Sequence, residues 1–148
     1  MAQTYTENFT EIHELAGATV DTFAIGAYSA LMANRSMANY QRAVAILMVG
    51  DVAQGATVDL ALWQATSAAG ANAKPITGKA ITTLTDADSN SVVCIEVRTE
   101  ELDVDGGFAY LVGVITVAGG NVDLGIIGFL GGANYPPVPT TNWTEIVL

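Results

Sequence analysis

The segment Gly107–Leu130 constrains the fold more than any other part of the chain. It consists of two apolar runs on either side of Ala118-Gly119-Gly120-Asn121. Glycine and asparagine supply the positive φ angles that tight turns between strands require. The pattern therefore predicts a β-hairpin. Because both faces of its strands are apolar, we expect one face to pack on a second sheet and the other on a sister subunit.

The same region could be mistaken for a membrane span, because residues 106–133 contain a single charged side chain, that of Asp123. A spanning helix needs about 20 consecutive apolar residues of helical character. Here glycine recurs throughout, and each glycine costs roughly 1 kcal/mol in a helix. We therefore expect strands and no membrane partner. Residues 1–15 are polar and acidic, with no basic or apolar region of the kind found in a signal peptide.

The remaining strands are predicted from alternating or continuous apolar residues. The continuous run Ala43–Val49 is typical of a strand that is buried on both faces. Ser29–Tyr40 is ambiguous between a loop and a short helix, and Thr66–Gly78 is small and polar, which favours a long exposed loop. The predicted strands are Val20–Tyr28, Ala43–Val49, Thr57–Ala65, Lys79–Thr85 and Ser91–Arg98.

The two ends of the chain differ from its middle, so we divide the sequence into an N-terminal arm (1–19), a β-sandwich domain (20–133) and a C-terminal arm (134–148). In the first arm, Thr10–Leu15 could form one helical turn. The second arm holds three of the four prolines, which favour extended polyproline geometry, and ends in apolar residues. We expect it to dock on a neighbouring subunit or on another partner, through Tyr135, Pro136, Pro137, Trp143, Ile146 and Leu148.

The charge of the chain argues against nucleic acid as a direct partner. Five basic residues stand against fifteen acidic ones, for a net charge of −10. Proteins that bind phosphate backbones do so through clusters of lysine and arginine, whereas the basic residues here are scattered. Hydrophobic residues make up 51% of the sequence, a high share for a small monomer, and this favours buried contacts between subunits.

Two acidic segments invite a metal-binding interpretation. Asp86-x-Asp88-x-Asn90 matches the opening of a calcium-binding loop, but the sixth position is Ser91 rather than glycine and the twelfth is Val97 rather than glutamate. We therefore predict a turn there, and no metal or cofactor. The second segment contains Glu100, Glu101, Asp103 and Asp105. We interpret it as an ordinary acidic turn that overlaps a single helical turn predicted at 99–103.

The sequence contains few residues that are typical of catalytic sites. His13 is the single histidine, and it lies in the predicted arm. Cys94 is the single cysteine and is predicted to be a small buried hydrophobe. Trp63 and Tyr110 are predicted to belong to the core. Alternatively, they could stack on a sugar, which would make the chain a carbohydrate-binding module. We predict that the protein is not an enzyme.

Four segments together resemble the capsid decoration, or cement, proteins of tailed bacteriophages. The resemblance lies in strand order and texture, and it extends over about residues 20–135. The segments are Ala43-Val-Ala-Ile-Leu-Met-Val-Gly-Asp-Val52, Thr57-Val-Asp-Leu-Ala-Leu-Trp-Gln-Ala65, Ile76-Thr-Gly-Lys-Ala-Ile-Thr-Thr-Leu-Thr-Asp-Ala-Asp88 and Gly107-Phe-Ala-Tyr-Leu-Val-Gly-Val-Ile-Thr-Val117.

This resemblance implies an all-β, jelly-roll-like antiparallel sandwich with extended terminal arms. It further implies a homotrimer that binds the assembled lattice of the major capsid protein, on the outer surface of the virion head, and stabilises it. The family has no catalytic motif, so no site residue is carried over. With this resemblance, the sugar-stacking alternative becomes a carbohydrate-binding head-fibre or adhesion module of a virion. One departure concerns the C-terminus, since many relatives end soon after the position of Tyr135 whereas this chain continues through Trp143.

Overall fold

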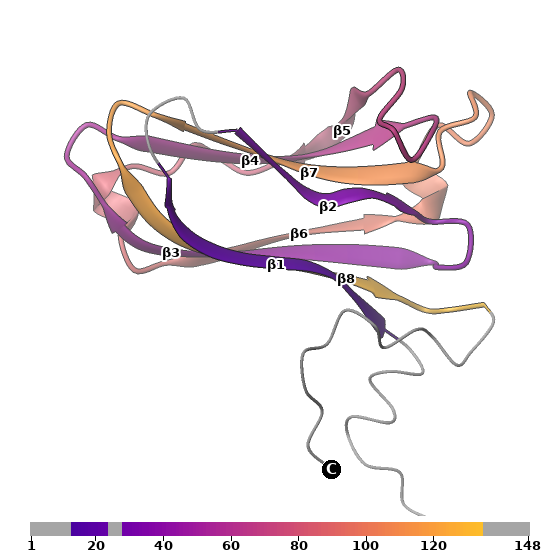
Figure 1. The fold of residues 1–148 in the computed structure, drawn as a ribbon, viewed down its shortest axis with the longest axis horizontal. Coiled ribbons are helices and arrows are strands. Elements are labelled where there is room, and N and C mark those ends of the chain that lie inside the picture. Colours follow the sequence, from indigo (N-terminus) through magenta and orange to yellow (C-terminus); the bar gives the residue numbers. More distant parts are fainter. Residues whose placement is uncertain (1–12, 24–27, 135–148) are drawn as a thin grey trace, which may run out of the picture.

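The fold is a sandwich of two antiparallel β-sheets (Figure 1). A computed structural model describes residues 13–23 and 28–134. One sheet has the strand order β1-β8-β3-β6 and the other β2-β7-β4-β5. The strands are β1 (His13–Phe23), β2 (Tyr28–Ser36), β3 (Arg42–Val52), β4 (Thr57–Ala65), β5 (Lys74–Ala80), β6 (Val92–Arg98), β7 (Tyr110–Ala118) and β8 (Val122–Gly131).

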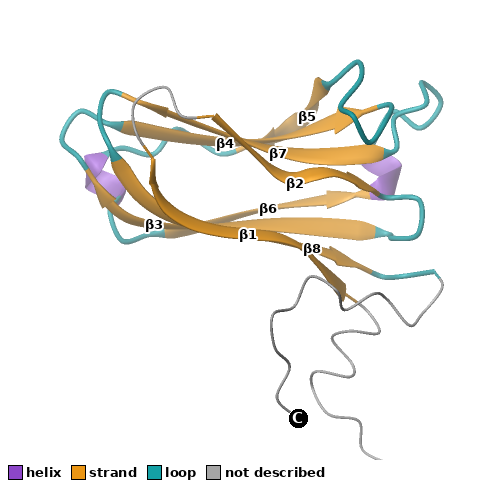
Figure 2. Cartoon of the chain, in the orientation of Figure 1, coloured by secondary structure: helices purple, strands orange, loops and turns teal. Residues whose placement is uncertain are grey.

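The strand order is that of a jelly roll. Successive strands alternate between the two sheets, except that β4 and β5 pair within one sheet, and the first strand of the chain lies beside the last. An eight-stranded double sheet of this kind consists of two Greek keys. Two short 3-10 turns, η1 (Asp86–Asp88) and η2 (Thr99–Glu101), lie at opposite ends of the sandwich (Figure 2). The predicted all-β jelly-roll sandwich is thus confirmed.

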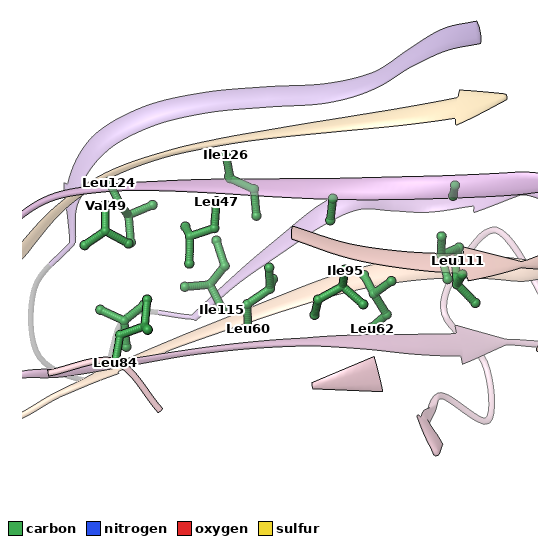
Figure 3. Close-up of a cluster of buried hydrophobic side chains, with 14 of the residues drawn as sticks. Leu47, Val49, Leu60, Leu62, Leu84, Ile95, Leu111, Ile115, Leu124 and Ile126 are labelled. Atoms are coloured by element: carbon green, nitrogen blue, oxygen red, sulfur yellow. The ribbon is translucent and has the colours of Figure 1, made fainter. Parts of the chain in front are cut away.

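The core fills the space between the sheets with aliphatic side chains from both layers (Figure 3). Alternation along the strands places these residues, because successive side chains of a strand point to opposite faces. In β4, for example, Val58, Leu60 and Leu62 are fully buried while the residues between them are half-buried. From the facing sheet, Leu47 and Ile126 are also fully buried.

The predicted hairpin at Gly107–Leu130 is wrong, although its turn exists. Gly119 has φ +77°, as a tight turn requires. However, β7 pairs with β2 and β4, whereas β8 pairs with β1 and β3, so this turn carries the chain from one sheet to the other. The two runs face each other across the core instead of lying side by side, and a repeat of apolar residues fits either arrangement.

The beginning of the sandwich also differs from the prediction. β1 starts at His13 and pairs with β8 along its whole length, so residues 13–19 belong to the sheet and the predicted boundary after residue 19 lies too late. The helical turn expected at Thr10–Leu15 is therefore wrong for residues 13–15. Residues 29–36, within the segment expected to be a loop or short helix, form most of strand β2 (Tyr28–Ser36) because they pair with β7.

Two further strands need correction. β3 is not buried on both faces, since its residues alternate between buried and half-buried. β5 begins at Lys74, inside the expected loop, and ends at Ala80. The edge position of β5 explains why Pro75 is tolerated there, because an edge strand leaves some backbone N–H groups without a partner strand. Leu84 makes only an isolated bridge to Val58.

In the described part of the chain, no helix is long and apolar enough to cross a membrane. The six C-terminal residues predicted to contact a partner lie outside the described residues.

Candidate interaction surface

An apolar surface covers the outer side of the sheet β1-β8-β3-β6. Seven side chains from three adjacent strands contribute, and we call them the outer apolar face. Their register places them together, since Ile46 lies opposite both Ile127 and Cys94, and Val44 lies opposite Phe129. Most are half-buried, but Cys94 is exposed and Val92 is 66% exposed. The seven residues are Val44, Ile46, Met48, Val92, Cys94, Ile127 and Phe129.

The outer side of the second sheet is different, because its apolar side chains are covered within the chain. Val112 and Val114 point away from the core but are only 6% and 7% exposed. Trp63 lies opposite Val112 and is half-buried, as is Tyr110 at the start of β7. A sugar-binding platform needs exposed aromatic rings, so these two residues do not favour the carbohydrate-binding alternative.

A polar hollow lies at the end of the sheet where β8 finishes. Arg42 is the cross-strand partner of both Arg98 and Gly131. Like charges directly opposite each other on a sheet are unfavourable, and here each arginine has its own acidic partner. Arg42 Nη1 lies 3.6 Å from Glu96 Oε1, and Arg98 Nη1 lies 3.3 Å from Glu100 Oε1. The hollow, of about 540 Å³, is lined by Ala38, Tyr40, Gln41, Arg42, Arg98, Thr99, Glu100 and Asn134.

A smaller groove joins this hollow to the outer apolar face. It has a volume of about 230 Å³ and shares Arg42 with the hollow. Val44 and Phe129 line it together with Glu96, so its floor is apolar and its rim is charged. Pockets that enclose small-molecule ligands usually measure roughly 300–1,000 Å³. The groove is therefore better suited to a single large side chain than to a small molecule.

The acidic segment 100–105 forms ion pairs with lysines of the edge strand β5. Lys74 Nζ lies 2.6 Å from Asp103 Oδ2, and Lys79 Nζ lies 2.9 Å from Glu101 Oε1. Hydrogen bonds from the lysines lower the pKa of both carboxyl groups, with further help from the backbone N–H groups of Arg98 and Gly106. These lysines tie the β5 edge to the segment that follows β6.

The lysine pairs have a second consequence for the edge of the sandwich. Lys79 also donates a hydrogen bond of 2.8 Å to the backbone carbonyl of Glu96 in β6, and the Lys74 ammonium lies 4.0 Å from the centre of the Phe108 ring. Charged lysines on an edge oppose pairing with a strand from another molecule. Addition of a strand from another molecule is thus disfavoured along this edge.

The calcium-like segment forms a turn, as predicted. Asp88 accepts hydrogen bonds from the backbone N–H and the hydroxyl of Thr85, at 2.9 and 3.0 Å, which closes the 3-10 turn η1. Within residues 13–23 and 28–134, no group of three or more His, Cys, Asp or Glu side chains is placed to hold a metal ion.

The prediction that Cys94 is buried is wrong. Cys94 is exposed because β6 is an edge strand and Cys94 points to its outer side, between Val92 and Glu96. The outer apolar face as a whole was missed, although a sequence feature could have revealed it. Val44, Ile46 and Met48 alternate with the core residues of β3 and were attributed to burial inside the sandwich.

The sequence matches no protein-family model, and no curated protein matches it in sequence. Solved structures do share its fold. The crystal structure of the infectious bursal disease virus VP2 subviral particle matches with a TM-score of 0.50 and 12% identity, over 84% of this chain and 33% of that chain. The X-ray structure of the Triatoma virus empty capsid has a TM-score of 0.48 and 9% identity, over 93% and 99%.

A third similar structure comes from the disulfide-linked pili that form Bacillus endospore appendages, with a TM-score of 0.42 and 10% identity, over 84% of this chain and 91% of that chain. The chain spans about a third of the length of the infectious bursal disease virus chains it matches. At these identities the likeness concerns the fold alone: this chain is similar to jelly-roll proteins that include viral capsid proteins.

Proposed function

We propose that this protein is a non-enzymatic structural protein of a virus particle. The observation that carries the proposal is a jelly-roll sandwich with an apolar outer sheet face, whose groove of about 230 Å³ suits a protein side chain better than a small molecule. An apolar patch rimmed by charges is typical of a surface that contacts another protein. The same fold in the VP2 subviral particle supports this assignment as an analogy of architecture.

More specifically, we propose that the protein is a capsid decoration protein of a tailed bacteriophage. The chain would bind the assembled lattice of the major capsid protein as a homotrimer, on the outer surface of the head, after synthesis in the host cytoplasm. The C-terminal arm would contact a sister subunit or the capsid. The resemblance of residues 20–135 to the decoration family supports this form, as does the 51% share of hydrophobic residues.

Physical chemistry explains how such binding would strengthen a particle. A protein that binds only the assembled lattice stabilises it by mass action, in the same way that a ligand stabilises the state it binds. A trimer that engages three equivalent positions also gains from a high effective concentration after its first contact. Neither effect needs a catalytic residue, a metal, nucleic acid or a membrane.

The experiment compares particles produced with and without the gene for this chain. Both are heated in steps, and release of the packaged nucleic acid is followed with a dye. We expect particles that lack the protein to open at a lower temperature, and addition of the purified native protein to restore the difference. Heat-denatured protein is the matched control. Equal opening temperatures with and without the native protein would contradict the proposed function.

A further inference from the structure

The outer apolar face is left partly uncovered by residues 35–134, the residues whose burial the structure describes. Its seven side chains come from three adjacent strands, and the two on edge strand β6 are exposed. A soluble chain rarely leaves a contiguous apolar sheet face in water. We therefore expect a further segment or a partner to cover it.

The C-terminal segment begins at the correct place to do so. Asn134, the last described residue, donates its backbone N–H to the Asn39 carbonyl at 2.9 Å, and its side chain accepts a hydrogen bond from Gln41 at 3.3 Å. Asn134 also lines the hollow that leads, through Arg42, into the groove beside Val44. The path from the start of the segment to the face is therefore continuous.

Length and composition also fit. Extended at roughly 3.3 Å per residue, residues 135–148 could reach about 45 Å. Strand β8 has 10 residues, or about 34 Å, so the segment is long enough to cross the hollow and return along the face. The prolines at 136, 137 and 139 lack the N–H groups that a ladder requires, which favours contact through side chains over strand addition. The end of the segment supplies apolar side chains at Trp143, Ile146 and Leu148.

We propose that, in the free protein, residues 140–148 dock on the outer apolar face of their own chain, with Trp143 in the groove formed by Val44 and Phe129. The groove has room for one large side chain, and Arg42 at its rim can stack on an aromatic ring. Attachment at Asn134 favours the same chain, because it gives the segment a high effective concentration at this face.

This docking describes the chain in solution, whereas the proposed contacts of the C-terminal arm with a sister subunit or the capsid describe the particle. The two are tested separately. The docking experiment contains no particles, so its failure leaves the proposed function intact. A failure of the particle experiment would likewise leave the docking intact.

The experiment uses tryptophan fluorescence of the full-length chain. The sequence has two tryptophans, so a Trp63→Phe background makes Trp143 the single reporter. In that background, Val44→Lys places a charge in the groove, and Thr116→Lys places the same charge at an exposed position of β7, on the other sheet, as a control. Circular dichroism checks that each variant is folded. If Val44→Lys is unfolded, Ile46→Thr takes its place, because it keeps the branched side chain and removes apolar surface.

We expect blue-shifted Trp143 emission that acrylamide quenches several-fold less in the background and Thr116→Lys proteins than in Val44→Lys or Ile46→Thr. The emission should not change when the protein is diluted a hundredfold. Equal emission and quenching in all the folded variants would overturn docking on this face. A blue shift that is lost on dilution would overturn docking on the same chain, and would indicate that the segment of another copy occupies the groove.

Discussion

Leu47 and Ile46 are neighbours in β3, and the structure assigns them opposite environments. Leu47 is 0% exposed in the core, whereas Ile46 is half-buried on the outer apolar face. In Leu47→Ala, the loss of three carbon atoms at roughly 0.8 kcal/mol each, together with the cavity left behind, gives a destabilisation of about 3 kcal/mol. Ile46→Ala removes side-chain atoms that are partly exposed already, and should cost only about 1 kcal/mol.

Urea unfolding of the monomeric chain, followed by circular dichroism, measures both values. For a slope of about 2 kcal/mol per M, Leu47→Ala should lower the unfolding midpoint by about 1.5 M, and Ile46→Ala by about 0.5 M. The slopes should stay constant, since neither substitution alters the surface exposed on unfolding by much. Equal losses at the two positions, or a larger loss at Ile46, would refute the register assigned to β3 and the two-layer core.

Lys79→Met should lower the free energy of unfolding more at neutral pH than at strongly acidic pH, where only the hydrogen bond to the Glu96 carbonyl is lost. The Lys79 pair lowers the pKa of Glu101, so the contribution of the ion pair is present above the ordinary value of 4.5 and is lost as the pH falls through the lowered one. Urea unfolding at both pH values tests this, and an equal loss at both would contradict it. Gly119→Ala should cost at least about 2 kcal/mol, because φ is +77° and a Cβ would collide with the Gly55 carbonyl. Gly55→Ala, with φ +79° and nothing within 4 Å of its Cβ, should cost only about 1 kcal/mol in the same thermal unfolding assay. Cys94 should react fully with a thiol reagent in the folded Val44→Lys protein, in which the C-terminal segment is displaced from the outer apolar face, and protection there until unfolding would contradict its position on the outer side of β6.

Sequence reasoning located the strands whose residues alternate. β4 has the predicted bounds, Thr57–Ala65, and β6 differs by one residue from the predicted Ser91–Arg98. These strands have regular apolar positions and clear turn residues on either side. The segment of β2, Tyr-Ser-Ala-Leu-Met-Ala-Asn-Arg-Ser, lacks such alternation, and its extended form depends on pairing with β7.

The partner of each strand was harder to predict. Periodicity reports which faces of a strand are apolar, but it does not report whether two consecutive apolar strands pair or face each other across a core. That is why the segment Gly107–Leu130 was expected to be a hairpin and proved to be a connection between sheets.

The outer apolar face was hard to predict for the same reason. Val44, Ile46 and Met48 were visible as apolar residues, but their position on an outer face depends on the assignment of β3, β6 and β8 to one layer.

The most direct measurement for the proposed function is binding of the purified chain to assembled heads that lack it. Heads and unassembled capsid subunits are each mixed with increasing amounts of the chain, and the bound fraction is measured after sedimentation. The proposal predicts saturable binding to heads, with three copies at each occupied position and no binding to free subunits. Absence of binding to heads, or equal binding to free subunits, would contradict a role in stabilising the assembled lattice.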